Sequence, residues 1–347
     1  METRMTKLFG IKHPIMLAGM GFVADDPKLV AAVSSAGGLG LLATGFLTPD
    51  RTRAAVKQIR QLTDKPFGAN VTLQFDYARE NAEVCVEEKV PVINWSLGKA
   101  DWLIKAVHGY GGKILGTVVK ARHAIRAEQD GADAVIVTGH EAAGHGGDVT
   151  SLVLIPAIAS KVKIPVIAAG GFCDGRGLAA ALALGAEGIS MGTRFAITKE
   201  SPLHQKTLEL CLKTTEEDTL CCVGPDGLSA RHIRTRTAEI LAQQKLPLVK
   251  TMRSAWEIKR SLNIPTWRLV VDGLKTRSVQ GLARQAITVT TMRRAVLDGD
   301  NKAGIMTIGQ VIGLIRDVPT CKEIIERTVA EAETTIEATW KEILASA

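Results

Sequence analysis

The residues best suited to chemistry lie in one short loop, 139–148, which is rich in glycine and alanine. This loop contains His140, Glu141 and His145. An imidazole titrates near neutral pH and can take a proton from a carbon acid. Small neighbours let the backbone pass close to a bound molecule and leave His145 facing an open cavity. We therefore predict that His145 is the catalytic residue and acts as an acid–base group.

A metal site is the alternative for the same loop. The spacing from His140 to His145 is one residue longer than in the helical zinc motif His-Glu-x-x-His, and the glycines of the loop oppose a helix. The six cysteines include no Cys-x-x-Cys pair, so they offer no metal-ligand spacing either. The sequence therefore predicts no metal and favours free thiols over disulfides.

Glycines at the ends of two apolar stretches indicate a phosphate site. Glycine exposes its backbone N–H group, and a helix that begins nearby favours an anion. Tight packing of glycine-rich turns is the structural alternative. The residues predicted to bind phosphate lie in the sequences 168–171 and 191–194, and they are Ala169, Gly170, Gly171, Met191, Gly192 and Thr193.

Two other apolar stretches end in residues that suit a flat ring. Ala18, Gly19 and Met20 form a turn whose backbone can lie against a planar molecule. The amide of Asn70 is costly to bury without a partner, and the edge of a ring offers one. A plain turn and a side-chain-to-backbone hydrogen bond are the structural alternatives. We predict that these four residues contact a ring.

These residues need a scaffold that brings them together, and short apolar runs alternating with helical patterns indicate one. The predicted strands are His13–Ala18, Leu39–Thr44, Phe67–Leu73, Val90–Ser96, Lys113–Val119, Ala132–Thr138, Ile164–Ala169 and Gly188–Gly192. The predicted helices are Pro27–Ala36, Pro49–Leu62, Tyr77–Glu88, Ala100–His108, Ala121–Gln129, Leu152–Ser160 and Gly175–Leu184. Eight alternations, with no Gly-x-Gly-x-x-Gly after the first strand, favour a (β/α)8 TIM barrel over an open α/β sheet. In a barrel the carboxyl ends of all strands share one face, where the residues above would meet.

The alternation stops after Ser201. We predict three parts: a TIM barrel over 1–200, a helical lid or substrate domain inserted after strand eight over 201–300, and C-terminal helices over 301–347 that pack back on the barrel. The helices predicted beyond the barrel are Leu208–Thr215, Ala238–Gln244, Met252–Leu262, Val271–Thr276, Val279–Leu297, Gly304–Ile315 and Cys321–Leu344.

Positive charge is concentrated in the segment 230–295, which has 14 Lys and Arg residues against three acidic ones. Such a segment favours a pyridine nucleotide, an acyl carrier or an acidic substrate, and a solvated helical face is the alternative. No nucleic-acid motif accompanies it, so we predict no nucleic-acid partner. No apolar stretch approaches the roughly 20 residues that span a bilayer, and no signal segment is visible, so we expect a cytoplasmic protein. A homodimer is left open.

Taken together, these motifs resemble the nitronate monooxygenase (2-nitropropane dioxygenase) family. This family belongs to an FMN-dependent superfamily that includes NADH:quinone reductases and flavin enoyl-acyl-carrier-protein reductases. The resemblance is carried by the residues 13–16, 66–70, 141–147, 168–171 and 191–195. It implies FMN as the cofactor, with Gly19 and Met20 behind the isoalloxazine ring, Asn70 at its pyrimidine edge, Ala143 and Gly144 beside it, and Gly170, Gly171, Gly192 and Thr193 at the phosphate. It also implies that His145 is the catalytic histidine. The pair Ala142-Ala143 departs slightly from the usual family loop.

Three functions follow as hypotheses. The first is oxidation of an alkyl nitronate by O2 to a carbonyl compound and nitrite, with His145 as the base for a neutral nitroalkane. The second is reduction of a quinone or an enoyl thioester by NAD(P)H, which the basic segment favours. The third is a non-redox phosphate-binding barrel such as an aldolase, which lacks a suitably placed Schiff-base lysine apart from Lys120. Structural or surface roles are predicted for His13, His108, His123, His204 and His232, and Cys173 is predicted to fill buried space.

Overall fold

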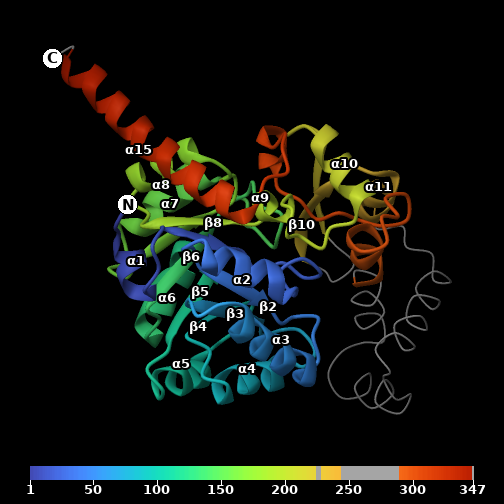
Figure 1. Cartoon of the computed structure of the whole chain (residues 1–347), viewed down its shortest axis with the longest axis horizontal. Helices are drawn as coiled ribbons and strands as arrows, with labels where there is room; N and C mark the ends of the chain where they lie inside the picture. Colours follow the sequence, from blue (N-terminus) through green and yellow to red (C-terminus); the bar gives the residue numbers. More distant parts are fainter. Residues whose placement is uncertain (224–227, 244–288, 346–347) are drawn as a thin grey trace.

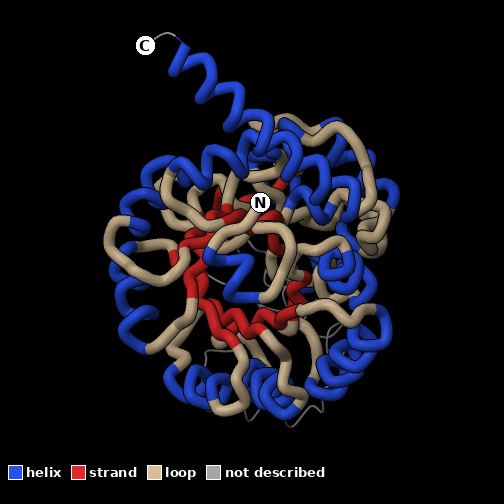
Figure 2. Tube along the Cα trace, turned by 60° about the vertical axis from the view of Figure 1, so that its left-hand side comes forward, coloured by secondary structure: helices blue, strands red, loops and turns tan. Residues whose placement is uncertain are grey.

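The computed structural model describes residues 1–223, 228–243 and 289–345, and its largest part is a ring of strands inside a ring of helices (Figure 1, Figure 2). The strands are β1 Ile15–Leu17, β2 Gly40–Ala43, β3 Phe67–Thr72, β4 Val92–Ser96, β5 Lys113–Val118, β6 Ala134–Thr138, β7 Val166–Ala169 and β8 Gly188–Met191. The helices around them are α2 Pro27–Ser35, α3 Pro49–Leu62, α4 Ala78–Glu87, α5 Asp101–His108, α6 Ala121–Asp130, α7 Ser151–Ala159 and α8 Gly175–Ala183. Each predicted strand and helix of this region exists, within a few residues at its ends.

The eight strands are parallel and follow each other around the sheet in the order β1-β8-β7-β6-β5-β4-β3-β2. The first and last strands of this order also meet, because Leu17 N donates to Leu39 O at 2.9 Å and Leu39 N donates to Ile15 O at 3.0 Å. Nearly all strand residues are buried, as expected where helices cover the outer face and side chains fill the interior. The prediction of a TIM barrel is confirmed.

A short helix that the sequence analysis did not predict, α1 Arg4–Phe9, lies across the amino-terminal end of the barrel (Figure 2). A capping box between Thr3 and Thr6 begins it, and the fully buried Met5 packs into the barrel base. Thr3 Oγ1 donates to Glu187 O at 2.7 Å, just before β8. This end of the barrel is therefore closed, and the opposite end is the one available to ligands.

The region after β8 contains α9 Thr193–Ala196, α10 Gln205–Lys213 and α11 Arg236–Ala242, but also an antiparallel hairpin. Its strands are β9 Thr219–Val223 and β10 Ser229–Ile233. The prediction of helices and loops alone is wrong at this hairpin, because strands of five residues are too short to show a clear period. The predicted helices Met252–Leu262 and Val271–Thr276 lie outside the described residues. Residues 289–296, the described end of the predicted helix Val279–Leu297, are helical.

The final segment begins without a long helix. The helix predicted over Gly304–Ile315 is wrong, since the structure has extended chain followed by one 3-10 turn, η1 Gln310–Leu314. Two positions near η1 require glycine: a Cβ on Gly304 would lie 2.5 Å from Asp300 O, and a Cβ on Gly309 would lie 2.9 Å from Glu141 O.

The predicted last helix is present as α15 Cys321–Ala345. It packs against α8 and α2 and then runs past the edge of the barrel (Figure 1). The helices α8 and α15 approach each other so closely that glycine is required, because a Cβ on Gly175 would lie 2.4 Å from Ala332 N. No helix in the described parts of the chain has both the length and the apolar character needed to cross a bilayer.

Candidate active site

The carboxyl ends of the barrel strands open into a cavity of about 300 Å³. Most of the residues predicted to bind ligands line it, and these are Ala18, Gly19, Met20, Asn70, Ala143, Gly144, His145, Ala169, Gly170, Gly171, Gly192 and Thr193. Met191 is the exception: it is fully buried and does not line the cavity, so its role in cofactor binding stays a prediction. Side chains alternate along a strand, and the neighbouring Ser190 is the β8 residue that faces the cavity.

On one side of the cavity, Gly19 and the side chain of Asn70 pack closely together. A Cβ on Gly19 would lie 2.6 Å from the Cβ of Asn70, so only glycine fits there. Asn70 donates from Nδ2 to Asn94 Oδ1, and Asn94 in turn donates to Leu115 O and Thr117 Oγ1, both at 3.0 Å. The Oδ1 atom of Asn70 accepts no hydrogen bond from the described residues and is left for a ligand donor.

Another side of the cavity offers backbone donors. Gly170 and Gly171 follow β7 with φ of 93° and 88°, a left-handed conformation that favours glycine. Within the described ranges, no acceptor engages the amide nitrogens of Gly170, Gly171 or Gly192. Nearby, Thr193 Oγ1 accepts from Gly309 N at 3.0 Å, which ties this turn to the C-terminal segment. Unused N–H groups beside a glycine cradle fit a phosphate.

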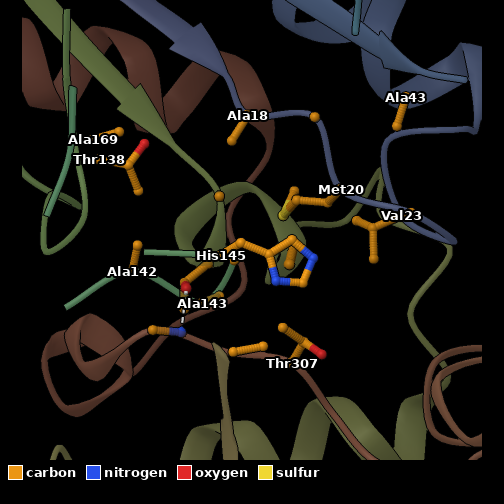
Figure 3. Close-up of a pocket in the computed structure, with 18 of the residues that line it drawn as sticks. Ala18, Met20, Val23, Ala43, Thr138, Ala142, Ala143, His145, Ala169 and Thr307 are labelled. Atoms are coloured by element: carbon orange, nitrogen blue, oxygen red, sulfur yellow. Dashed lines mark hydrogen bonds between the residues drawn. The ribbon is translucent and has the colours of Figure 1, made fainter. Parts of the chain in front are cut away.

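His145 projects into the middle of the cavity, between Met20 and Thr307 (Figure 3). Its Nδ1 atom lies 3.0 Å from Ser229 O on β10. A carbonyl oxygen can only accept, so Nδ1 carries a proton in this contact, and Nε2 is the ring nitrogen suited to proton exchange. The fixed tautomer suits a general base whose imidazolium form Ser229 O would stabilise.

The other polar side chains of the loop support its shape. Glu141 accepts from the backbone N and the Oγ of Ser151, each at 3.0 Å, at the start of α7. Nδ1 of His140 donates to Gly147 O at 3.0 Å. The side chains of Glu141 and His140 are therefore both held by hydrogen bonds to other protein groups. The described residues contain no cluster of three His, Cys, Asp or Glu side chains arranged to hold a metal ion.

The hairpin and the segment 305–309 form a second wall, which the sequence analysis missed. Arg231 on β10 donates from its backbone N to Ala143 O at 3.0 Å and from its guanidinium to His140 O at 3.1 Å. Ile308 N donates to Arg231 O at 3.1 Å. The hairpin therefore connects the loop 139–148 to the C-terminal segment on its other side.

His232 also belongs to this second wall, although the sequence analysis predicted only a structural or surface role for it. It is 5% exposed, it lines the cavity, and its Nδ1 lies 3.1 Å from Thr307 Oγ1. Burial, together with the smaller effect of the nearby His145, lowers the pKa of His232 to about 4. Two-residue alternation would have identified it once the hairpin was known, since Ala230 also faces the cavity.

The structure also shows where Cys173 and Lys120 lie. Cys173 is buried, and burial raises the pKa of its thiol to about 12, so it fills space as an unreactive group. Lys120 is exposed just before α6 and does not line the cavity, although Thr117 on β5 does. A Schiff-base role for Lys120 therefore has no support in this geometry.

The model of the nitronate monooxygenase family matches residues 2–89 and 76–331. A dehydrogenase of (3aS,4S,5R,7aS)-5-hydroxy-7a-methyl-1-oxo-octahydro-1H-indene-4-carboxyl-CoA from Rhodococcus jostii is 37% identical over 97% of this chain and 98% of its own length. The solved structure of FabK from Thermotoga maritima is also 37% identical, with a TM-score of 0.84 over 99% of both chains. A probable nitronate monooxygenase from Staphylococcus aureus is 30% identical over 70% of this chain and 81% of its own. The chain is a member of the nitronate monooxygenase family of oxidoreductases.

Proposed function

We propose that this protein is an FMN-dependent oxidoreductase that acts on an acyl-coenzyme A thioester, with His145 exchanging the substrate proton. The observation that carries this proposal is the 37% identity, over nearly the whole of both chains, to the carboxyl-CoA dehydrogenase of Rhodococcus jostii. The cavity agrees with it, because its lining is mostly small and apolar around the imidazole of His145.

The residues present fit FMN. Gly19 leaves room for the Asn70 side chain, whose Oδ1 can accept from an N–H on the edge of a flat ring. The amides of Gly170, Gly171 and Gly192 have no protein acceptor within the described ranges and would hold the phosphate. When bound, FMN supplies the acceptor or donor of a hydride.

His145 handles the proton that accompanies the hydride. In the dehydrogenation direction, Nε2 takes a proton from the carbon beside the thioester carbonyl while the neighbouring carbon loses a hydride, and a C=C double bond forms. The Nδ1–H bond to Ser229 O orients the ring and stabilises its charged form. Reduction of an enoyl thioester runs the same steps in reverse, so His145 returns the proton.

Oxidation of nitronates with O2, the function that the sequence analysis favoured, is the second candidate. Its support is the match to the family model and the 30% identity to the probable nitronate monooxygenase from Staphylococcus aureus. A nitroalkane is also a carbon acid, so His145 would remove the same kind of proton. The geometry of one base in an apolar cavity serves both reactions.

The two candidates differ in what reduces and what reoxidises the flavin. Anaerobic enzyme mixed with NADH or NADPH should lose its flavin absorbance, and crotonyl-CoA should then restore it with formation of butyryl-CoA. A parallel aerobic assay measures nitrite from alkyl nitronates. Nitrite formation, together with a flavin that neither nucleotide nor butyryl-CoA can bleach, would replace the thioester proposal with nitronate oxidation.

A further inference from the structure

The cavity wall that the hairpin and the C-terminal segment form is apolar except at one place. Its described cavity-lining residues come from β10 and the stretch 292–311 and include Ala230, Val296, Met306 and Ile308. The polar side chains among them are those of His232 and Thr307, which bond to each other at 3.1 Å. The two residues are also joined as an antiparallel backbone pair, so the position of the imidazole is set by main chain as well as side chain.

This pairing uses only one of the two ring nitrogens of His232. The other, Nε2, has no hydrogen-bond partner among the described residues, and it is not among the atoms sealed from solvent. Since 95% of the residue is buried and the residue lines the cavity, the opening at Nε2 is toward the cavity. A polar atom without a protein partner in an apolar wall costs free energy unless a ligand or water satisfies it.

We propose that His232 is a specificity residue whose Nε2 hydrogen-bonds an oxygen, hydroxyl or carbonyl, on the group that enters the cavity. The substrate would then be an oxygenated acyl group rather than a plain hydrocarbon chain. The acyl part of this statement depends on the proposed function, whereas the oxygen recognition depends only on the cavity wall.

The chemistry of the pair fits either kind of oxygen. The hydroxyl of Thr307 can donate to Nδ1 or accept from it, so Nε2 can carry a proton for a carbonyl or a lone pair for a hydroxyl. Burial and the neighbouring His145 lower the pKa of His232 to about 4. The ring therefore stays neutral at pH 7 and leaves the proton transfer to His145.

The test uses matched ligands that differ by one oxygen. Binding to the FMN-loaded enzyme is measured from the change in flavin absorbance, with calorimetry as a second readout. One pair is acetoacetyl-CoA and butyryl-CoA. The other set has no thioester: 1-indanone, 1-indanol and indane. The variants are His232→Phe, His232→Gln and Thr307→Val, and His204→Asn on α10 is the control because it lies outside the cavity lining.

We expect wild type to bind the oxygenated member of a set roughly 10- to 100-fold more tightly than its hydrocarbon partner, the range typical of one buried hydrogen bond. The phenylalanine variant should lose this preference while it binds indane at least as well. The preference for the oxygenated ligand should be partly kept in His232→Gln and weakened in Thr307→Val. It should be unchanged in the control His204→Asn. Flavin content of each variant confirms that the fold is intact.

Other results would overturn the inference. It fails if wild type shows no preference for oxygen, or if the phenylalanine variant keeps the preference or weakens both members of a set equally. If neither thioester binds but the preference for indanone depends on His232, then the proposed function fails and the inference stands. The two statements are therefore separable in one experiment.

Discussion

The cavity has two kinds of wall, and they are built on different principles. The barrel side presents backbone at the ends of regular strands, as at Gly19 and Gly170, and its contacts are with neighbours in the sheet. The hairpin side is assembled from β10 and the segment 305–309, which are joined across 75 residues at His232 and Thr307. The first wall can hold a cofactor common to many barrels, and the second can be changed without disturbing the barrel.

The two walls also differ in the polar side chains that each of them buries. The barrel wall buries two neutral amides, Asn70 and Asn94, which bond to each other, whereas β10 buries both an arginine and a histidine. Arg231 Nε has no hydrogen-bond partner and is sealed from solvent. Buried polar groups are expensive unless they are satisfied, so we interpret the hairpin wall as a place where stability is exchanged for positioning and specificity.

The largest expected effect lies where the two walls meet, at His145. We expect His145→Ala to lower kcat for an acyl thioester by roughly 10²- to 10⁴-fold, the usual contribution of a general acid–base group. Flavin binding should change little, because the phosphate and ring contacts come from other residues. The measurement is kcat in the alanine variant against His204→Asn, a control in which asparagine can still cap α10. Unchanged kcat would remove His145 from the reaction.

The barrel wall is tested at Gly170. Gly170→Ala should weaken FMN binding by roughly 100-fold, because a Cβ there would lie 3.1 Å from Gly139 N in the predicted phosphate turn. Gly111→Ala is the matched control: its φ of 81° gives a similar strain, but nothing lies within 4 Å of its Cβ and it is far from the cavity.

FMN affinity and the free energy of unfolding should be measured together for this pair. Both variants should lose about 1–2 kcal/mol of stability from the left-handed backbone, whereas only Gly170→Ala should lose the cofactor. Equal FMN affinity in the two variants would contradict a phosphate site at this turn.

The same comparison explains what could be predicted from sequence. Gly170, Gly171 and His145 each follow a buried strand, so the βα rhythm alone places them at the carboxyl face. Met191 lies outside the cavity lining because strand parity decides which of two neighbours faces the cavity, and Ser190 does. Parity depends on the exact pairing of β1 with β8, which no local pattern records.

The hairpin wall could not be predicted for a different reason. Its contacts join residues far apart in the chain, such as Arg231 with His140 and Gly309 with Thr193, and neither β9 nor β10 is long enough to stand out. Gly309 is required because a Cβ there would meet Glu141 O at 2.9 Å, a constraint that exists only after folding. Tertiary contacts of this kind leave no periodic pattern in the sequence.

Two buried groups, Asp25 and His232, should make the stability respond to pH in opposite directions. Burial raises the pKa of Asp25, in the β1–α2 loop, to about 6, so the native state binds an extra proton between pH 4 and 6 and stability falls as pH rises. The pKa of His232 falls to about 4, so the unfolded state binds the extra proton between pH 4 and 6.5 and stability rises with pH. Each group corresponds to about 3 kcal/mol over its full range.

These opposing contributions should nearly cancel in wild type and separate in variants. Urea unfolding of the FMN-loaded protein at pH 4.5, 5.5 and 6.5 should show stability rising with pH in Asp25→Asn and falling in His232→Gln. If both variants follow the wild-type pH dependence, then neither group is buried as the structure places it.

The prediction with the smallest expected effect asks whether the hairpin wall positions the loop that carries His145. Arg231→Met removes the guanidinium bonds to His140 O and Thr219 Oγ1, at 3.1 and 3.2 Å, but keeps the backbone bond to Ala143 O. We expect kcat to fall roughly 10-fold, since small displacements of a catalytic group are costly, while KM and FMN affinity stay near wild type. Arg234→Met, at an exposed position just beyond the same strand, is the control and should be neutral. A matching loss in the control, or a change in KM without one in kcat, would mean that the hairpin binds ligand without orienting His145.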